Sequence, residues 1–253
     1  WCGGMGAAVS SVELIAPAKL TLSLRITGVR SDGYHLIDAE MVSVVLSDTV
    51  RITESSNTSL QISGPFAEGV PNDASNIALR ALALANRTAA VEIVKNIPHG
   101  GGLGGGSTDA ATVLRWAGYT DLDSASRIGA DVPFCMVGGR ARVRGIGEIV
   151  EPLPANSHTL PLTLIVPPLQ VSTPVVYKAW DDLGGPTSAG VNDLEPAACA
   201  AYPDLGRWRS QIKALGLEPI LAGSGATWFV HGHFKDIAKA LPDARVYFTE
   251  TLA

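Results

Sequence analysis

The chain has 253 residues, of which 46% are hydrophobic and 17% charged, and its formal net charge at pH 7 is -5. This length provides one large or two small globular domains, and the negative balance argues against nucleic acid or an anionic membrane as a general partner. The three cysteines, Cys2, Cys135 and Cys199, match no zinc-binding spacing, and no apolar run approaches a membrane span, so we expect a protein of the reducing cytoplasm.

The N-terminal part of the chain predicts alternating strands and helices. Residues 1–6 lack a basic segment followed by an apolar one, so no signal peptide is predicted. Strands are predicted from alternating apolar runs, and a helix from strong helix formers behind cap residues. In chain order, the elements are strands at 11–15, 20–26, 40–46 and 48–53, a helix at 76–86, a strand at 91–94, a helix at 110–117, a short helix from 126 that ends near Gly129, and a strand at 140–144.

The C-terminal part predicts a second unit. The Pro-containing stretch 151–158 marks the boundary, so we expect an N-terminal domain at 11–150 and a C-terminal domain at 158–253. The order of the predicted elements is the split βαβ pattern, and the chain as a whole is predicted to be α+β. These elements are a strand at 160–166, helices at 174–180 and 204–215, strands at 218–222 and 227–230, a helix at 234–241 and a strand at 244–249.

Residues 99–108 (His-Gly-Gly-Gly-Leu-Gly-Gly-Gly-Ser-Thr) form a glycine loop between a predicted strand and a predicted helix. Bare backbone N–H groups can approach an anion there, and the helix dipole favours its charge, which predicts a nucleotide-using protein. A flexible linker is the alternative, but the loop joins two elements directly. The Walker loop is excluded because Ser107 stands where its Lys is required. A dinucleotide-binding loop is disfavoured because the acidic candidates Asp121 and Asp123 lie in a turn-like segment.

Three segments occur in the order that is typical of one family of small-molecule kinases. Segments 16–19 (Ala-Pro-Ala-Lys), 98–108 and 221–226 (Leu-Ala-Gly-Ser-Gly-Ala) resemble the three motifs of the GHMP kinases, which include galactokinase, homoserine kinase and mevalonate kinase. The resemblance spans most of the chain. It implies a two-domain GHMP kinase fold, with an N-terminal ribosomal protein S5 domain 2-like unit and a C-terminal ferredoxin-like unit.

Further segments resemble one branch of that family, the kinases that act on 4-diphosphocytidyl-2-C-methyl-D-erythritol. They are 30–36 (Arg-Ser-Asp-Gly-Tyr-His-Leu), 129–134 (Gly-Ala-Asp-Val-Pro-Phe) and 192–195 (Asn-Asp-Leu-Glu). The resemblance implies phosphorylation of the 2-hydroxyl group of that compound by ATP, a step on the non-mevalonate route to isoprenoid precursors.

Two charged residues are the candidate catalytic pair. Asp131 lies in an apolar segment, where an isolated carboxylate would be costly, and Lys19 is alone in another apolar stretch. A purely structural buried ion pair is the alternative. The resemblance implies that Asp131 takes the proton of the hydroxyl group and that Lys19 orients and polarises that group.

The resemblance also implies an ATP site, and Mg²⁺ is expected because ATP carries it and few protein ligands are needed. Asn76 and Lys95 match positions near the adenine; a helix cap and a solvated strand lysine are the alternatives. The hydroxyl groups of Ser107 and Thr108 can cap the following helix, touch a phosphate or, for Ser107, contact Mg²⁺. The ATP-binding candidates are Pro98, His99, Gly100, Gly101, Gly102, Leu103, Gly104, Gly105, Gly106, Ser107, Thr108, Asn76 and Lys95.

A substrate site is implied by aromatic and glycine residues from distant segments. Tyr34 would stack on the cytosine, His35 would hydrogen-bond it, and Tyr177 would close its other face; a half-buried turn aromatic and a surface histidine are the alternatives. Gly223, Ser224 and Gly225 would shape a turn beside the substrate phosphates, or form a plain hairpin turn. At Thr21 the chain departs from the family, which carries Asn there.

Two other functions are weighed against this one. A kinase of the same fold could act on another small alcohol, which Tyr34, His35 and segment 192–195 disfavour. A nucleotide-binding protein without catalysis could use the same scaffold, which the retention of Lys19 and Asp131 disfavours.

Overall fold

The structure is a computed structural model that describes residues 10–155 and 157–252. Three sequence predictions concern residues outside these ranges: Cys2, the signal-peptide prediction for residues 1–6, and the end of the C-terminal domain at residue 253. Within the described ranges, no helix combines the length and the apolar character that crossing a membrane requires.

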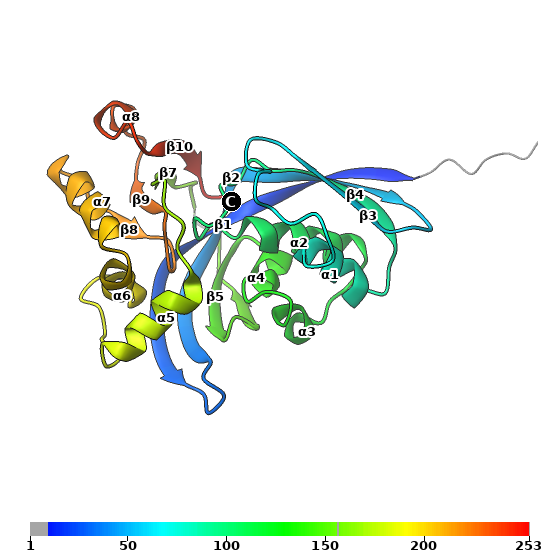
Figure 1. Cartoon of the computed structure of the whole chain (residues 1–253), viewed down its shortest axis with the longest axis horizontal. Helices are drawn as coiled ribbons and strands as arrows, with labels where there is room; N and C mark the ends of the chain where they lie inside the picture. Colours follow the sequence, from blue (N-terminus) through cyan, green and yellow to red (C-terminus); the bar gives the residue numbers. More distant parts are fainter. Residues whose placement is uncertain (1–9, 156, 253) are drawn as a thin grey trace, which may run out of the picture.

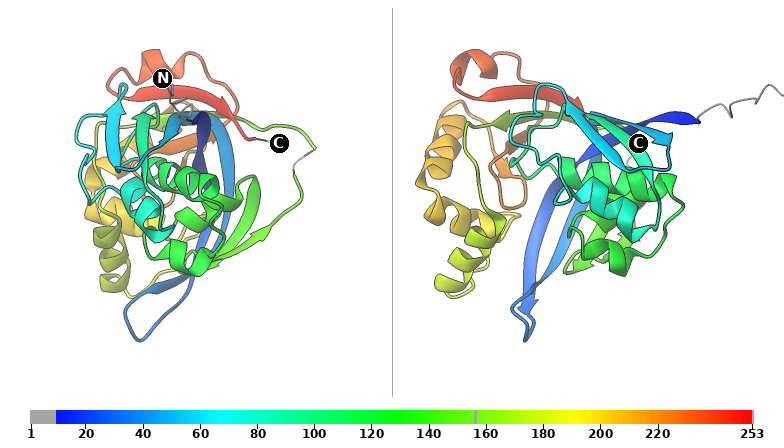
Figure 2. Two further views of the ribbon diagram at one scale, coloured as in Figure 1. Left: turned by 90° about the vertical axis from the view of Figure 1, so that its right-hand side faces the viewer. Right: turned by 45° about the vertical axis from the view of Figure 1, so that its right-hand side comes forward.

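A long antiparallel hairpin organises the N-terminal unit (Figure 1). Its strands are β1 (Ser11–Val29) and β2 (His35–Glu54), and its tip projects beyond the rest of the molecule (Figure 2). The other edge of β2 pairs with β4 and β5, while β3 runs parallel to β4 and β6 pairs with β5. These four strands are β3 (Ser59–Ser63), β4 (Ala89–Val94), β5 (Arg140–Gly145) and β6 (Ile149–Pro152).

The sequence predicted two successive strands within 11–26 and two within 40–53. This is wrong, because each of these regions is one continuous strand. The gap expected at 16–19 is instead a register shift between Pro17 and Lys19 in the pairing with β2. A bulge of this kind accommodates a residue that has no N–H group, so the strand continues through it. Strands β3 and β6 were not predicted.

Four helices gather on one side of this sheet (Figure 1). They are α1 (Ile77–Leu84), α2 (Gly105–Trp116), α3 (Leu122–Ser126) and α4 (Val132–Val137). Helix α2 begins inside the glycine loop, earlier than the predicted residue 110. The predicted helix from 126 is wrong, because Gly129 lies in the connection between α3 and α4.

The C-terminal unit is a four-stranded antiparallel sheet in the order β10-β7-β9-β8, which is the split βαβ arrangement. Helix α6 was not predicted, and β8 and α8 are shorter than predicted. The elements are β7 (Pro161–Val166), α5 (Thr173–Asp182), α6 (Leu194–Ala201), α7 (Pro203–Ala214), β8 (Ile220–Leu221), β9 (Trp228–His231), α8 (Ile237–Ala240) and β10 (Arg245–Glu250).

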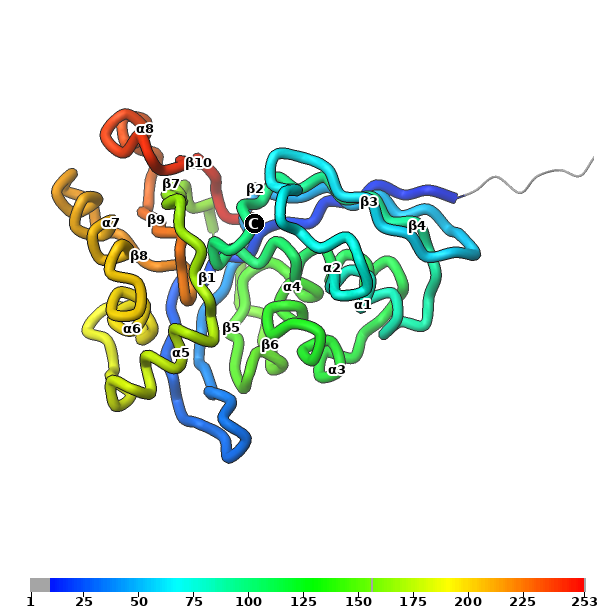
Figure 3. Tube along the Cα trace, in the orientation of Figure 1, coloured from blue at the N-terminus to red at the C-terminus, as the bar shows by residue number. Residues whose placement is uncertain are grey.

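The long hairpin contacts both units. Leu24 of β1 donates its N–H to Val191 O and accepts from Asp193 N, both at 2.9 Å. Behind β10, Leu252 N donates to Ser43 O of β2, and Figure 3 shows the chain end beside that strand. Because one buried cluster contains Leu20 and Phe229, the core continues across the junction. The division into domains at 151–158 stays a prediction.

Candidate active site

The predicted catalytic pair is brought together between β1 and α4. Lys19 Nζ lies 3.0 Å from Asp131 Oδ2, and it donates to Thr21 Oγ1 at 3.3 Å. The Lys19 side chain is 6% exposed, whereas that of Asp131 is 29% exposed. All three residues line a cavity of about 160 Å³, so the pair has an open side that a reactant can approach.

The glycine loop leaves unpaired donors next to this cavity. Helix α2 begins after Gly104, whose φ of +68° is left-handed, and no side chain caps it. The alternative that Ser107 or Thr108 caps α2 is therefore wrong. The backbone N–H groups of 104–107 find no acceptor among the described residues. These donors and the helix dipole together form an anion site.

Glycine is required in this loop because of close packing. Lys19 N donates to Leu103 O at 3.0 Å, which ties the loop to β1. A Cβ at Gly104 would lie 2.6 Å from Lys19 Cγ, and one at Gly102 would overlap the carbonyl oxygen of Ala222. The loop can touch Lys19 and segment 221–226 only without side chains at these two positions.

Segment 221–226 is held against the catalytic pair. Asn192 is 1% exposed, and its Nδ2 donates to Leu221 O at 2.9 Å and to Gly223 O at 2.7 Å. A Cβ at Gly223 would lie 3.8 Å from Lys19 Nζ. Ser224 shares a 2.8 Å hydroxyl hydrogen bond with Thr173, which the sequence did not single out. Asn192, from a segment that matched the family, thus supports the turn that borders the cavity.

A buried ionic cluster lies beneath the glycine loop. Lys95 is 2% exposed, so the alternative of a solvated lysine is wrong. Its Nζ contacts the carboxylates of Asp48 and Asp109, the latter at 2.6 Å. Burial, together with the Asp48 charge and against the Lys95 ammonium, raises the pKa of Asp109 to about 7. Burial opposes the charge of Lys95, but the two carboxylates overcome it and raise the pKa of Lys95.

A second cavity, of about 540 Å³, is bordered by this cluster and by α1. Asn76 lines it, and its side chain is committed to the protein: Oδ1 accepts from Ala78 N at 2.9 Å and Nδ2 donates to Pro71 O at 2.7 Å. Asn76 therefore caps α1, as the alternative interpretation of this residue expected. Lys95, His99 and Gly106 line the same cavity, so four of the predicted ATP-binding residues meet there.

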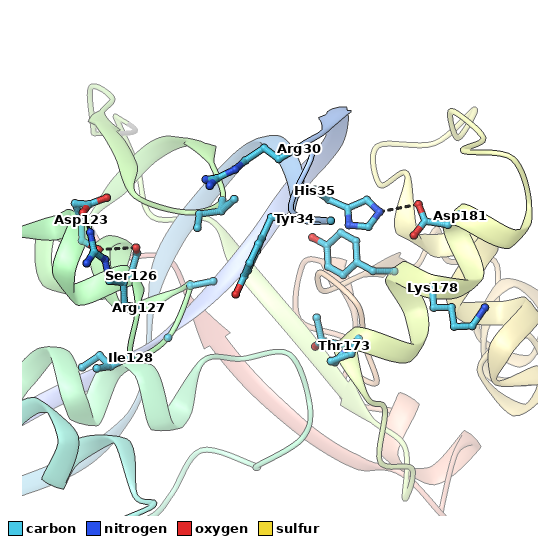
Figure 4. Close-up of a pocket in the computed structure, with 16 residues that line it drawn as sticks. Arg30, Tyr34, His35, Asp123, Ser126, Arg127, Ile128, Thr173, Lys178 and Asp181 are labelled. Carbon is cyan, nitrogen blue, oxygen red and sulfur yellow. Dashed lines mark hydrogen bonds and ion pairs between the residues drawn. The ribbon is translucent and has the colours of Figure 1, made fainter.

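The aromatic candidates border a third, open cavity of about 920 Å³ (Figure 4). Tyr34 is 58% exposed on the hairpin, whereas the side chain of His35 is 9% exposed, so His35 is no surface residue. The rings of His35 and Tyr177 are 4.7 Å apart between centroids. His35 Nε2 lies 2.8 Å from Asp181 Oδ1 of α5, a residue that no sequence motif indicated.

The cavities share walls, and this joins the predicted sites. His35, Tyr177, Ala130 and Thr173 line both the open cavity and the one at the catalytic pair. The open cavity therefore continues to Lys19 and Asp131. Gly104, where α2 begins, packs against the Lys19 side chain, so the free N–H groups of α2 start beside the catalytic pair.

Comparison with known proteins identifies relatives over nearly the whole chain. Residues 74–139 match the family described as "GHMP kinases N terminal domain". The 4-diphosphocytidyl-2-C-methyl-D-erythritol kinase of Paracoccus denitrificans (strain Pd 1222) is 39% identical over 248 residues, covering 89% of this chain and 88% of that protein. Its namesake from Ruegeria pomeroyi is 36% identical, covering 91% and 94%.

Solved structures agree in fold. A crystal structure of 4-(cytidine 5'-diphospho)-2C-methyl-D-erythritol kinase superposes with a TM-score of 0.74 at 31% identity, covering 96% of this chain and 100% of that one. The L. major mevalonate kinase in complex with R-mevalonate gives a TM-score of 0.63 at 15% identity, which is a likeness of fold alone. The α+β, two-unit kinase fold expected from the sequence is confirmed.

Proposed function

The chain belongs to the 4-diphosphocytidyl-2-C-methyl-D-erythritol kinase branch of the GHMP kinase family, and we propose that it phosphorylates the 2-hydroxyl group of that compound with ATP. The observation that carries the proposal is the contact of Lys19 with Asp131 beside the open N-terminus of α2. Such a site joins a base, a cation and a phosphate-binding loop, which are what phosphoryl transfer requires of a protein.

Asp131 is the proposed base. Its partly exposed carboxylate accepts the proton of the 2-hydroxyl group as the oxygen attacks the γ-phosphorus, and ADP leaves. Lys19 contributes the cation: its ammonium, 3.0 Å from that carboxylate, orients the hydroxyl group and offsets the negative charge that develops. Thr21, bonded to the same ammonium, lies within the substrate pocket at the position where the family carries Asn.

The cytidyl end of the substrate is assigned to the open cavity. Tyr34 and Tyr177 supply aromatic faces for the cytosine, and His35 supplies a directional hydrogen-bonding group in the same cavity. Because this cavity continues to the catalytic pair, a substrate with its base there can direct its hydroxyl group to Asp131. Gly223, Ser224 and Gly225 would lie beside the substrate phosphates.

ATP is assigned to the glycine loop at 98–108 and the cavity beside Asn76 and Lys95. The N–H groups of 104–107 would bind its phosphates. The Nζ of Lys95 is already paired with the carboxylates of Asp48 and Asp109. Lys95 would therefore act near the adenine as part of this ionic cluster.

We propose that Mg²⁺ accompanies the ATP. Within residues 10–155 and 157–252, no three His, Cys, Asp or Glu residues come together as a metal-holding group. The proposal rests on ATP itself, since Mg²⁺ is bound largely by phosphate oxygens and water and needs few protein ligands. Ser107, on the first turn of α2, is the protein group that we assign to this contact. When bound, the ion neutralises part of the charge on the transferring phosphates. The cytoplasmic location also stays a prediction.

The test is the identity of the product. The purified chain, Mg-ATP and 4-diphosphocytidyl-2-C-methyl-D-erythritol should give ADP and a compound with one new phosphomonoester on the methyl-bearing carbon, observed by phosphorus NMR. ATP consumption without that phosphomonoester would contradict the proposal.

A further inference from the structure

His35 has one ring nitrogen whose partner is fixed. Its Nε2 lies 2.8 Å from Asp181 Oδ1, as the dashed line in Figure 4 shows. An ionised carboxylate can only accept hydrogen bonds, so Nε2 carries the proton in this contact. In a neutral imidazole the other nitrogen, Nδ1, is then an acceptor with a free lone pair.

The ring is also held in place by packing. Tyr177 lies against it with a centroid distance of 4.7 Å, and Trp180 meets it edge-on at 5.5 Å. All three contacts come from α5, whereas His35 is the first residue of β2. Nδ1 finds no partner among the described residues, and His35 lines both the open cavity and the cavity at the catalytic pair. The ring therefore presents an unpaired acceptor next to a binding space.

We propose that Asp181 is a specificity-determining positioning residue, which holds His35 so that Nδ1 accepts a hydrogen bond from the 4-amino group of the cytosine. The inference rests on the proposed function, because it requires a cytidyl group in the open cavity. Asp181 acts through His35 and does not touch the base itself.

This arrangement discriminates between pyrimidines by hydrogen-bond polarity. Cytosine carries an amino donor at position 4, whereas uracil carries a carbonyl acceptor there. An acceptor on the protein forms a hydrogen bond with the amino group of cytosine. With uracil the same acceptor faces the carbonyl oxygen, so neither acceptor has a donor. Without the carboxylate at 181, the proton of His35 can move to Nδ1, and the ring can then donate to the uracil oxygen.

A purely structural tie between α5 and the hairpin is the competing explanation. Loss of such a tie would weaken binding of any pyrimidine nucleotide to the same degree. Loss of a fixed tautomer changes the ratio of the affinities for cytidine and uridine nucleotides. This ratio is the readout that separates the two.

Asp182 provides a matched control for charge and position. It follows Asp181 on α5, its side chain is 63% exposed, and it pairs with Lys178 rather than with His35. Asp181→Ala and Asp182→Ala therefore remove the same charge from neighbouring positions, but only the first releases His35.

The experiment measures the affinities of CDP and UDP by titration calorimetry at pH 8, with saturating ADP to occupy the ATP site. The wild-type chain should prefer CDP, Asp181→Ala should lower the CDP-to-UDP affinity ratio about tenfold, and Asp182→Ala should keep it within about twofold. Nitrogen NMR of the free wild-type chain should show His35 protonated at Nε2 and not at Nδ1, with the signal assigned by its loss in His35→Gln.

Two results would overturn the role of Asp181 and leave the proposed substrate untouched. They are an unchanged affinity ratio in Asp181→Ala and a wild-type His35 that is protonated at Nδ1. Failure of the wild-type chain to bind either nucleotide would instead contradict the proposed substrate, and the base-recognition role would fall with it.

Discussion

Lys19 Nζ and Asp131 Oδ2 lie 3.0 Å apart, although one residue comes from the bulged strand β1 and the other directly precedes α4. The ammonium is almost fully buried and the carboxylate keeps an open side. A structural role alone does not require either partner to face a cavity. The exposed face of Asp131 in a cavity is instead what a base requires, and the first prediction follows from it.

Asp131→Asn should lower the phosphorylation rate by about 10²–10⁴-fold, because an amide cannot accept the hydroxyl proton. ATP affinity should remain within about twofold, since the glycine loop is not altered. Initial rates and ATP titrations measure the two effects. Asp182→Asn, at an exposed position on α5, is the control for loss of charge. Unchanged turnover in Asp131→Asn would remove the assignment of the base.

Gly104→Val should weaken ATP binding by about tenfold or more. Its side chain would meet Lys19 Cγ and displace the N-terminus of α2. Gly118→Val is the matched control: it lies beyond the C-terminal end of the same helix, has φ of +71° against +68°, and has open space around its Cβ position. Both variants should lose about 1–2 kcal/mol of stability to the left-handed backbone, but only Gly104→Val should lose affinity. Equal ATP affinities would count against the phosphate-binding loop.

Tyr34→Ala should raise the KM for the cytidyl substrate about tenfold or more, with little change in the KM for ATP. An exposed ring at the open cavity offers a face for base stacking, which is worth about 1–3 kcal/mol per base. Tyr34→Phe keeps that face and should behave like the wild type. Parallel increases in the two KM values of Tyr34→Ala would refute stacking on the cytosine.

Asp109→Asn should change how stability depends on pH. Burial raises the pKa of Asp109 to about 7 in the folded chain, above its ordinary 3.8, so the folded state holds the extra proton. The stability from this site is complete below about pH 4 and is lost as the pH rises through about 7. Between pH 5 and pH 8 the variant should therefore gain roughly 1–3 kcal/mol in unfolding free energy relative to the wild type.

Urea unfolding at the two pH values measures this difference. Asp236→Asn removes a charge from a side chain that is 94% exposed and should follow the wild type. Parallel pH profiles for Asp109→Asn and the wild type would show that Asp109 is not protonated near neutrality in the folded state.

Local patterns predicted the elements whose signals are complete within a short window. The strand that became β4 and the helix that became α1 follow from alternation and a cap residue. The gap expected at 16–19 was wrong because the bulge that carries the strand through Pro17 depends on pairing with β2. The predicted helix from 126 to near Gly129 was wrong because the chain there forms two helices, of which α4 packs on α2 and α3 packs on α4.

The site divides in the same way. Lys19 could be named from the sequence because it is a lone charge in an apolar stretch, and Gly104 because it belongs to a dense glycine run between a strand and a helix. Asp181, Asp48 and Asp109 could not, since an aspartate on a helix or strand looks solvated until its partner is known. His35 and Lys95 are those partners, and the contacts exist only after distant segments meet.

The most direct test of the account is a rate comparison across small alcohols. The wild-type chain is assayed with Mg-ATP and 4-diphosphocytidyl-2-C-methyl-D-erythritol, mevalonate or homoserine, with Asp131→Asn as the background. The account predicts that kcat/KM for the cytidyl compound exceeds that for the other two by at least about 10³-fold and falls to background in the variant. Equal rates on the three alcohols, or no transfer to the cytidyl compound, would contradict it.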